Sequence, residues 1–285
     1  MNFDFGISTM VYYQEPLEKL LPYLHNWKIE IMEIRPKVGH FQPQRLEEVI
    51  ELKKRLQQNG ILVKSIHMPI DGVDISHPEE YDRIKSVREV EKTIMIASNL
   101  KAELVVVHPG ANCHEADDRK KRLALSIESL EEIVDFSEST SIKIALENTL
   151  PGRVGDRWEE IQQIMEEVPS KNLGICLDTG HYLVNYQHII QNDLYLDKLP
   201  INWQDKLFHI HIHDNNGKGD AHLLPGEGIF PWPSFMDFVK EINYQGTLII
   251  EPTEQREKYE LSDCLNRAME IWKRMQEYFI VSKFQ

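Results

Sequence analysis

Eight short apolar runs, spread over the whole chain, dominate its sequence pattern. They are rich in β-branched residues and predict strands at Phe3–Ser8, Ile29–Ile34, Ile61–Ile66, Leu104–Val107, Ile142–Leu146, Leu173–Leu177, Leu207–Ile212 and Thr247–Ile250. Segments with helical apolar spacing lie between them, as in Leu46–Leu56 and Ile161–Val168. Continuous apolar strands that alternate with helices are typical of a parallel sheet covered on both faces. Eight such units predict a single (β/α)8 TIM barrel, with an open doubly wound sheet as the alternative.

The chain shows no break that would divide this barrel. No linker rich in Ser, Gly or Pro interrupts residues 1–285, a length close to the ~250 residues typical of such barrels. Helix signals agree with the alternation, because Pro43 and Pro78 stand near predicted helix starts and Asn59–Gly60 near a predicted helix end. We therefore expect one domain over residues 1–285.

Composition excludes several classes of protein. With 41% hydrophobic and 27% charged residues, the chain has the balance of an ordinary globular protein. No run approaches the roughly 20 apolar residues of a membrane helix, and no basic-then-apolar leader opens the chain, so we expect a cytoplasmic protein without membrane contact. The cysteines lie far apart, at Cys113, Cys176 and Cys264, and form no C-x-x-C pair. Any bound metal must therefore use nitrogen and oxygen ligands.

The net charge of −14 disfavours long-range attraction to nucleic acid. Its weight is small, since divalent cations can reverse the potential of one cleft while the rest of the surface stays acidic. The sequence leaves the oligomeric state open, and a homo-oligomer is compatible with it.

The predicted strands end in metal-ligand residue types. Active sites of these barrels lie at the carboxyl ends of the strands. The imidazoles and carboxylates there, and in the loop after strand seven, are His67, His108, Glu147, Asp178, His181, His211, Asp220, His222 and Glu251. Such groups are the ligands of Zn²⁺, Mn²⁺, Fe²⁺ or Co²⁺, and nine exceed what one ion of four to six ligands uses. The pattern therefore predicts a site for two or three ions.

Each of these residues, taken singly, also has a structural explanation. A lone histidine is most often a hydrogen-bonded polar residue, and a lone carboxylate often caps the next helix. Six successive strands that end in such groups favour metal, because uncompensated carboxylates would repel each other on one axis. His209 and His213 alternate with His211 on one strand face. We expect His209 in the core and His213 beside the ligands or the substrate.

Basic residues in two loops are candidates for binding an anionic substrate. The loops Asn148–Arg157 and Asp214–Pro233 follow strands five and seven, so both overhang the predicted site and are lid candidates. Arg153, Arg157 and Lys218 lie in them. The basic run Arg119–Arg122 begins a predicted helix and is read as a solvated helix face.

The motifs that carry these residues resemble the xylose-isomerase-like TIM barrel superfamily. They are Ser-Ile-His-Met-Pro, Val-Val-His-Pro-Gly, Ala-Leu-Glu-Asn-Thr, Gly-Ile-Cys-Leu-Asp-Thr-Gly-His, His-Ile-His-Asp, Asp-Ala-His and Ile-Ile-Glu-Pro. The superfamily holds sugar and sugar-phosphate isomerases and epimerases, and also the endonuclease IV nucleases of AP endonuclease family 2. In the nuclease branch all nine positions ligate a three-zinc cluster, so the resemblance implies that this chain can build one.

Around the metal the chain departs from the nuclease branch. Gly180 stands where the nucleases carry Cys, His213 where they carry Asn, and Pro69–Gly72 replaces a Tyr-Leu-Ile-Asn-like segment. The stretch from His211 to Gly228 is more similar to members described as sugar phosphate isomerases or epimerases.

Two enzymatic hypotheses follow from the resemblance. In the first, a metal-dependent isomerase or epimerase of sugars or sugar phosphates, Glu147 and Glu251 transfer a proton and His181 donates to an oxygen, while His213, Arg153 and Lys218 bind substrate. In the second, three zinc ions cleave a phosphodiester at an abasic site in DNA. The first implies one or more Zn²⁺ or Mn²⁺ ions and a sugar as partner, and is favoured over nucleic acid. A barrel that binds sugar without turning it over is the remaining alternative.

Overall fold

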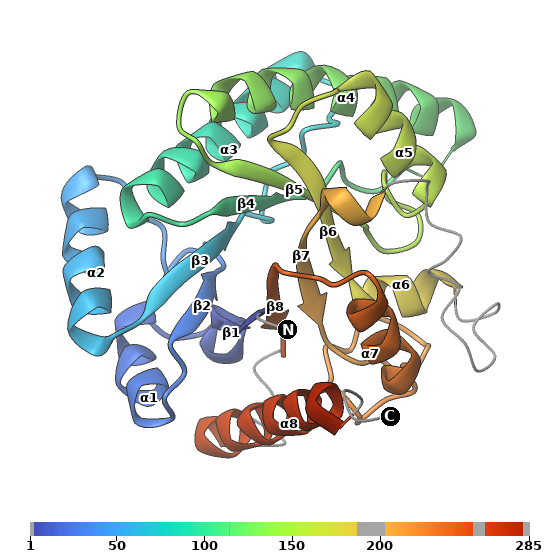
Figure 1. Ribbon diagram of the computed structural model, residues 1–285. Coiled ribbons are helices and arrows are strands. Elements are labelled where there is room, and N and C mark those ends of the chain that lie inside the picture. The colour runs from blue at the N-terminus through green and yellow to red at the C-terminus, as the bar shows by residue number, and fades with distance from the viewer. Residues whose placement is uncertain (1–2, 114, 187–202, 253–259, 282–285) are drawn as a thin grey trace.

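Eight parallel strands close into a barrel in chain order, and helices surround it (Figure 1). The computed structural model describes residues 3–113, 115–186, 203–252 and 260–281. The strands are β1 (Asp4–Ser8), β2 (Ile31–Ile34), β3 (Leu62–His67), β4 (Leu104–Val107), β5 (Lys143–Glu147), β6 (Leu173–Asp178), β7 (Leu207–Ile212) and β8 (Thr247–Ile250). Parallel pairing of Asp4–Ile7 with Thr247–Ile250 closes the ring. The predicted TIM barrel is confirmed, and the open sheet is excluded.

Helices alternate with the strands along the chain. They are α1 (Leu21–Asn26), α2 (Leu46–Asn59), α3 (Glu80–Leu100), α4 (Ala116–Glu138), α5 (Trp158–Glu167), α6 (Thr179–Tyr186), α7 (Trp232–Glu241) and α8 (Leu261–Val281). Their apolar faces pack on the outside of the strands and form one large buried core with them. The helical spacing read from the sequence at residues 46–56 and 161–168 lies in α2 and α5.

Some strands begin one or two residues later than the apolar runs predict. Ile29 and Ile61, expected to open β2 and β3, instead donate their amides to Leu24 O and Leu56 O, each at 2.9–3.0 Å. These bonds close the preceding helix, and Gly60 takes the left-handed conformation that this ending requires, with φ 68°. The first apolar residue of such a run therefore completes a helix, although its side chain is still buried.

The inside of the barrel changes from apolar to polar along the strands. Leu104, Val106, Ala145 and Cys176 form a small buried apolar cluster with the partly buried Phe208. Side chains two residues apart on a strand face the same side. Two residues beyond Val106, Ala145 and Cys176 come His108, Glu147 and Asp178. The alternation therefore sets polar groups above an apolar floor, at the carboxyl end of the barrel.

The loop after β7 is organised around one buried carboxylate. Asp214 accepts hydrogen bonds from the amides of Asn215, Gly226 and Phe230 and from Trp232 Nε1, at 2.8–3.0 Å. Its own amide and carbonyl pair with Leu223. The segment that carries Asp220 and His222 is thus fixed by internal contacts, whereas the expected lid function stays a prediction. Within the described part of the chain, no helix combines the length and the apolar character needed to cross a bilayer.

Candidate metal centre

The nine predicted ligands converge at the carboxyl end of the barrel. Eight of them are at most 8% exposed: His67, His108, Glu147, Asp178, His181, His211, His222 and Glu251. The side chain of the ninth, Asp220, is 21% exposed. These residues come from β3, from the ends of the next strands through β8, and from the loop after β7. Their side chains form three groups that share or adjoin Glu147.

The first cluster consists of His67, His108 and Glu147. Nε2 of His67 lies 3.1 Å and Nε2 of His108 lies 2.7 Å from the same oxygen, Glu147 Oε2. The other ring nitrogen of His67 lies 2.7 Å from the carbonyl oxygen of Met68, which orients the ring. One carboxylate oxygen therefore faces two imidazoles from neighbouring strands.

The second cluster surrounds Nδ1 of His211. This nitrogen lies 3.0 Å from Glu147 Oε1, 3.7 Å from Asp178 Oδ2 and 3.9 Å from Glu251 Oε2. Glu147 thus offers one oxygen to the first cluster and the other to the second. Three carboxylates from β5, β6 and β8 meet at one imidazole.

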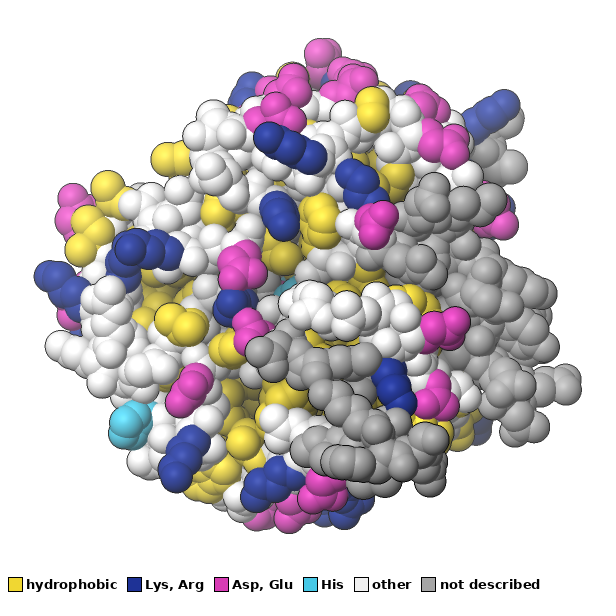
Figure 2. All heavy atoms as spheres, in the orientation of Figure 1, with side chains coloured by type: hydrophobic (Ala, Val, Ile, Leu, Met, Phe, Trp, Pro, Cys, Tyr) yellow, Lys and Arg dark blue, Asp and Glu magenta, His cyan; other side chains and the backbone are white. Residues whose placement is uncertain are grey.

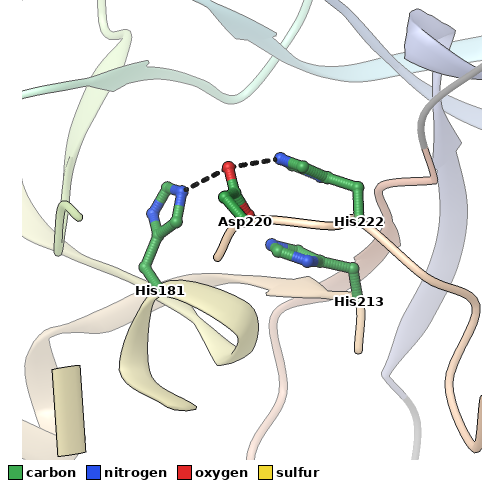
Figure 3. Close-up of side chains that lie close together, drawn as sticks. All are labelled: His181, His213, Asp220 and His222. Carbon is green, nitrogen blue, oxygen red and sulfur yellow. Dashed lines mark hydrogen bonds and ion pairs between the residues drawn. The ribbon is translucent and has the colours of Figure 1, made fainter. Parts of the chain in front are cut away.

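The third cluster consists of His181, Asp220 and His222 (Figure 3). Asp220 Oδ2 lies 3.5 Å from His181 Nε2 and 2.9 Å from His222 Nε2. His213 lies beside the cluster, and its ring stacks on that of His222 with centroids 3.9 Å apart. Nε2 of His213 lies 2.9 Å from Asp178 Oδ1. The expected position of His213, next to the ligands, is where the structure has it.

The carboxylates of the site are held in their ionised form. Burial alone would raise the pKa of Glu147, but the imidazoles of His108 and His211 outweigh it and hold that pKa well below its ordinary range. The pKa of Glu251 is lowered in the same way, against burial, chiefly by Arg35. Hydrogen bonds from His181 and His222 outweigh burial and depress the pKa of Asp220. Ionised carboxylates are the form that binds cations.

The imidazoles divide into neutral and protonated groups. Burial lowers the pKa of His108 to about 4, so this ring is neutral at pH 7. Burial opposes protonation of His181 as well, but Asp178 and Asp220 raise its pKa to about 10. Protons on such rings compensate the buried carboxylates, and a bound cation would take over that role.

The residues present fit divalent metal ions. A tetrahedral ion with bonds of about 2.0–2.1 Å holds its ligand atoms roughly 3.3 Å apart. The separations in the three clusters run from 2.7 to 3.9 Å. His108 Nε2 is buried and makes no well-aligned hydrogen bond with the described residues, although it points at Glu147. Nitrogen and oxygen donors of this kind suit zinc, manganese or iron.

The sequence prediction missed two charged residues at this site, the buried Glu33 and the part-buried Arg35. Glu33 of β2 lies beneath the second cluster, where Oε2 is 3.0 Å from His209 Nε2 and accepts from Ser65 Oγ at 2.7 Å. Its other oxygen, Oε1, lies 3.1 Å from His211 Nε2. Arg35 follows β2 and donates to Glu251 Oε1 at 2.9 Å. A charged residue inside an otherwise apolar buried strand was the available signal for Glu33.

Asn148 links β5 to β6 below the ligands. Its side chain accepts from the amide of Asp178 at 2.8 Å and donates to the carbonyl of Asp178 at 3.1 Å. Its own carbonyl oxygen lies 2.9 Å from His181 Nδ1, so Nε2 of His181 is left facing Asp220. Asn148 thus orients two of the ligands, a role the sequence motif alone did not indicate.

The predicted substrate-binding cations differ in position. Arg153 lines a cavity that also contains His108. Lys218 is exposed in the loop after β7, and among the described residues no hydrogen bond or ion pair joins its side chain to the three clusters. The side chain of Arg157 is 64% exposed and lies 3.7 Å from Asp156. Arg119, read from the sequence as a solvated residue, is instead part-buried between Asp156 and Glu160.

The amino-acid sequence of this chain is similar to those of several known proteins. Uncharacterized protein MJ1311 of Methanocaldococcus jannaschii is 29% identical over 95% of this chain and 91% of its own length. D-psicose 3-epimerase of Enterocloster bolteae is 23% identical over 72% of this chain and 66% of its own. A probable endonuclease 4 of Carboxydothermus hydrogenoformans is 28% identical over 54% of each chain.

Solved structures and a family model extend this result. The crystal structure of a D-tagatose 3-epimerase-like protein superposes with a TM-score of 0.82 at 27% identity, covering 99% of this chain and 100% of that one. The family model described as "xylose isomerase-like TIM barrel" matches residues 23–277. That match spans β2 to β8 and most of α8, and the resemblance seen in the sequence motifs is confirmed. The chain belongs to the xylose isomerase-like TIM barrel family.

Proposed function

We propose that this protein is a divalent-metal-dependent epimerase or isomerase of ketose sugars, in which Glu147 and Glu251 transfer the proton. The observation that carries the proposal is the second cluster. Glu147 ends β5 and Glu251 follows β8; each is 1% exposed, and their oxygens lie 3.0 and 3.9 Å from His211 Nδ1. Two carboxylates from distant strands therefore reach one cation position, and removal and return of a proton on two faces of a carbon requires two such groups.

The residues would divide the chemistry between them. A divalent ion held by Glu147, Asp178, His211 and Glu251 would polarise the ketose carbonyl and stabilise negative charge on its oxygen. One glutamate takes the proton from the neighbouring carbon, and the electron pair of the C–H bond moves toward the carbonyl oxygen. The other glutamate would pass a proton from water to that carbon on the opposite face, and the first would release its proton to water, so that both carboxylates return to their ionised form. Arg35, 2.9 Å from Glu251, favours that ionised form of Glu251.

The relatives and the surface charge support sugar chemistry over nucleic acid. An epimerase and an epimerase-like protein are among the proteins similar to this chain over most of its length. Acidic and basic side chains are interspersed on the described part of the face in Figure 2, and the net charge is −14. A duplex-binding protein needs a basic footprint for phosphate contacts.

Solvent-isotope exchange tests the proposal. The Mn²⁺-loaded protein is incubated in D2O with a panel of ketoses, and deuterium at the carbon beside the carbonyl is followed by mass spectrometry and NMR. We expect incorporation by the wild type, loss of it in Glu251→Gln, and full retention in the control Glu30→Gln, which changes an exposed glutamate. Absence of deuterium in every ketose would contradict the proposal.

A three-ion phosphodiesterase is the second candidate. It is favoured by the third cluster, because Asp220 and His222 have no necessary role in a single-ion proton transfer, whereas a trinuclear site uses all nine ligands. It predicts zinc-dependent scission of a synthetic abasic site in DNA that a chelator abolishes. Elemental analysis separates the two, since three zinc ions per chain favour the hydrolase and one ion favours the epimerase.

A further inference from the structure

A side cavity adjoins the first cluster at the mouth of the barrel. Its volume is about 180 Å³, and it lies between the loops that follow β3, β4 and β5. Met68, Ile70, Val73 and Ile75 supply apolar lining, and His108, Asn112 and Arg153 supply polar groups. Because His108 belongs both to the first cluster and to this lining, the cavity is adjacent to the ligands at the mouth of the barrel. The proposed mechanism does not use it.

Arg153 carries the uncompensated positive charge of this cavity. Its Nε donates to Asn112 Oδ1 at 3.2 Å. No acidic side chain among the described residues lies within ion-pair distance of its guanidinium. Its backbone is fixed by pairing with Asn112 and by a hydrogen bond from Arg119 to its carbonyl at 3.0 Å. The guanidinium of Arg153 is thus held at the cavity, and its two terminal nitrogens stay available to donate hydrogen bonds to a ligand.

The one carboxylate that lines the cavity already has partners. Asp74 Oδ2 lies 2.9 Å from Arg122 NH1, and Arg122 also pairs with Asp118 at 3.0 Å. Its Oδ1 accepts from the amides of Ser76 and Ala111 and from the Ser76 hydroxyl, at 2.7–3.2 Å. Both oxygens of Asp74 are therefore directed to other partners, and Asp74 forms no ion pair with Arg153 among the described residues. The cavity combines an apolar wall with one unpaired cation, which suits a molecule with a short carbon chain ending in an anion.

We propose that this cavity binds the far end of the substrate, and that this end carries an anionic group, a phosphate or a carboxylate, held by Arg153 and Asn112. The inference rests on the proposed function and narrows its substrate class to ketoses with a terminal anion. The planar guanidinium donates two parallel hydrogen bonds to either group, and the Asn112 side-chain amide can add another. The carbonyl end would then lie toward the second cluster, past His108.

Binding measurements with matched probes test this inference. Calorimetry compares D-fructose, D-fructose 6-phosphate and D-fructuronate on the Mn²⁺-loaded protein. We expect at least one of the two anionic probes to bind about ten- to a hundredfold tighter than fructose. Arg153→Gln should reduce that preference to less than about threefold. Arg153→Lys keeps the positive charge but loses the two parallel donors of the guanidinium, so it should give an intermediate value. Arg157→Gln, in the same loop but outside the cavity lining, should leave it unchanged.

The outcomes separate this inference from the proposed function. A preference for the phosphate probe or for the uronate identifies the anion and supports the inference. Equal binding of all three probes, or a preference that Arg157→Gln removes as fully as Arg153→Gln, overturns it. If the probes undergo isotope exchange but the anionic ones bind with no Arg153-dependent preference over fructose, the epimerase proposal stands while the anion site fails. If Arg153-dependent binding occurs with no isotope exchange in any probe, the site stands while the epimerase proposal fails.

Discussion

Gly180 and His213 are sterically interdependent. A Cβ atom on Gly180 would lie 1.9 Å from Cε1 and 2.3 Å from Nδ1 of His213, far inside contact distance. The missing side chain leaves room for the imidazole, whose Nε2 reaches Asp178 Oδ1 at 2.9 Å. The sequence departs from the nuclease pattern at both positions, with Gly for Cys and His for Asn. The geometry explains why these two departures occur together: the larger ring needs the smaller neighbour.

Gly180→Ala should therefore destabilise the protein by about 1–3 kcal/mol, as expected for an added methyl group in a packed interior. His213→Asn shortens the opposing side chain, so the double variant Gly180→Ala/His213→Asn should recover part of that loss. Urea denaturation of the wild type, both single variants and the double variant measures the coupling, which we expect at about 0.5–3 kcal/mol. Strictly additive effects would show that the two residues do not interact.

Glu33→Gln should weaken metal binding. The carboxylate of Glu33 accepts from Nε2 of His211, which directs the lone pair of Nδ1 toward the second cluster. Loss of such a partner costs about 10–100-fold in metal affinity. Competition with a chromophoric chelator measures the affinity for Mn²⁺ and Zn²⁺. Glu30→Gln, which changes an exposed glutamate three residues earlier in the chain, is the control. Unchanged affinity in Glu33→Gln would leave Glu33 a purely structural residue.

His222→Asn should separate the metal-binding roles of the third and second clusters. His222 lies 2.9 Å from Asp220 Oδ2 but is not one of the groups around His211 Nδ1. For an epimerase we expect isotope exchange within about tenfold of wild type, whereas Glu251→Gln should lose about 10²–10⁴-fold. Elemental analysis should show unchanged metal content in His222→Asn for a single-ion epimerase, and the loss of about one ion per chain for a trinuclear site. Loss of exchange as severe as in Glu251→Gln would favour a chemistry that needs every ion.

His40 should make the protein less stable in mild acid. It is 6% exposed, and Nδ1 lies 2.6 Å from the carbonyl oxygen of Glu15. Burial lowers its pKa below the ordinary 6.5, although the Glu15 carbonyl opposes that shift. The unfolded chain therefore binds this proton first, so the free energy of unfolding should fall as pH drops through 6.5 and level off below the folded pKa.

The comparison that isolates His40 is His40→Asn, whose amide can keep a hydrogen bond to Glu15 but does not titrate. Urea denaturation at pH 7, 6 and 5, in chelator, should give a flatter pH dependence for this variant than for wild type. His25→Asn, which changes an exposed histidine that also faces a backbone carbonyl, reports the background effect. Parallel curves for His40→Asn and wild type would contradict the prediction.

The barrel and the outline of its site could be predicted because both depend on periodicity. A parallel strand is buried on both faces, so it stands out as an apolar run, and the residue just past each run lies at the mouth. His67, Glu147 and Asp178 were found in this way. Glu33 was not, because it lies one position inside its run and its partners, Ser65 and His209, come from other strands.

Contacts between loops were beyond the reach of the sequence. The part-buried position of Arg119 depends on Asp156 and Glu160, which belong to the next unit of the barrel. The same holds for Arg153, since Asp74, which lines the same cavity, is paired with Arg122 instead. Such pairings depend on three-dimensional loop shape, and strand periodicity carries no information about them.

Asp214 gathers the donors of its own loop, so the backbone that carries Asp220 and His222 depends on one buried carboxylate. The loop is also tied to its surroundings, because Asn215 donates to the carbonyl of Gly180 and His222 Nδ1 lies 2.8 Å from the carbonyl of Glu251. A disturbance at Asp214 would therefore shift two members of the third cluster at once.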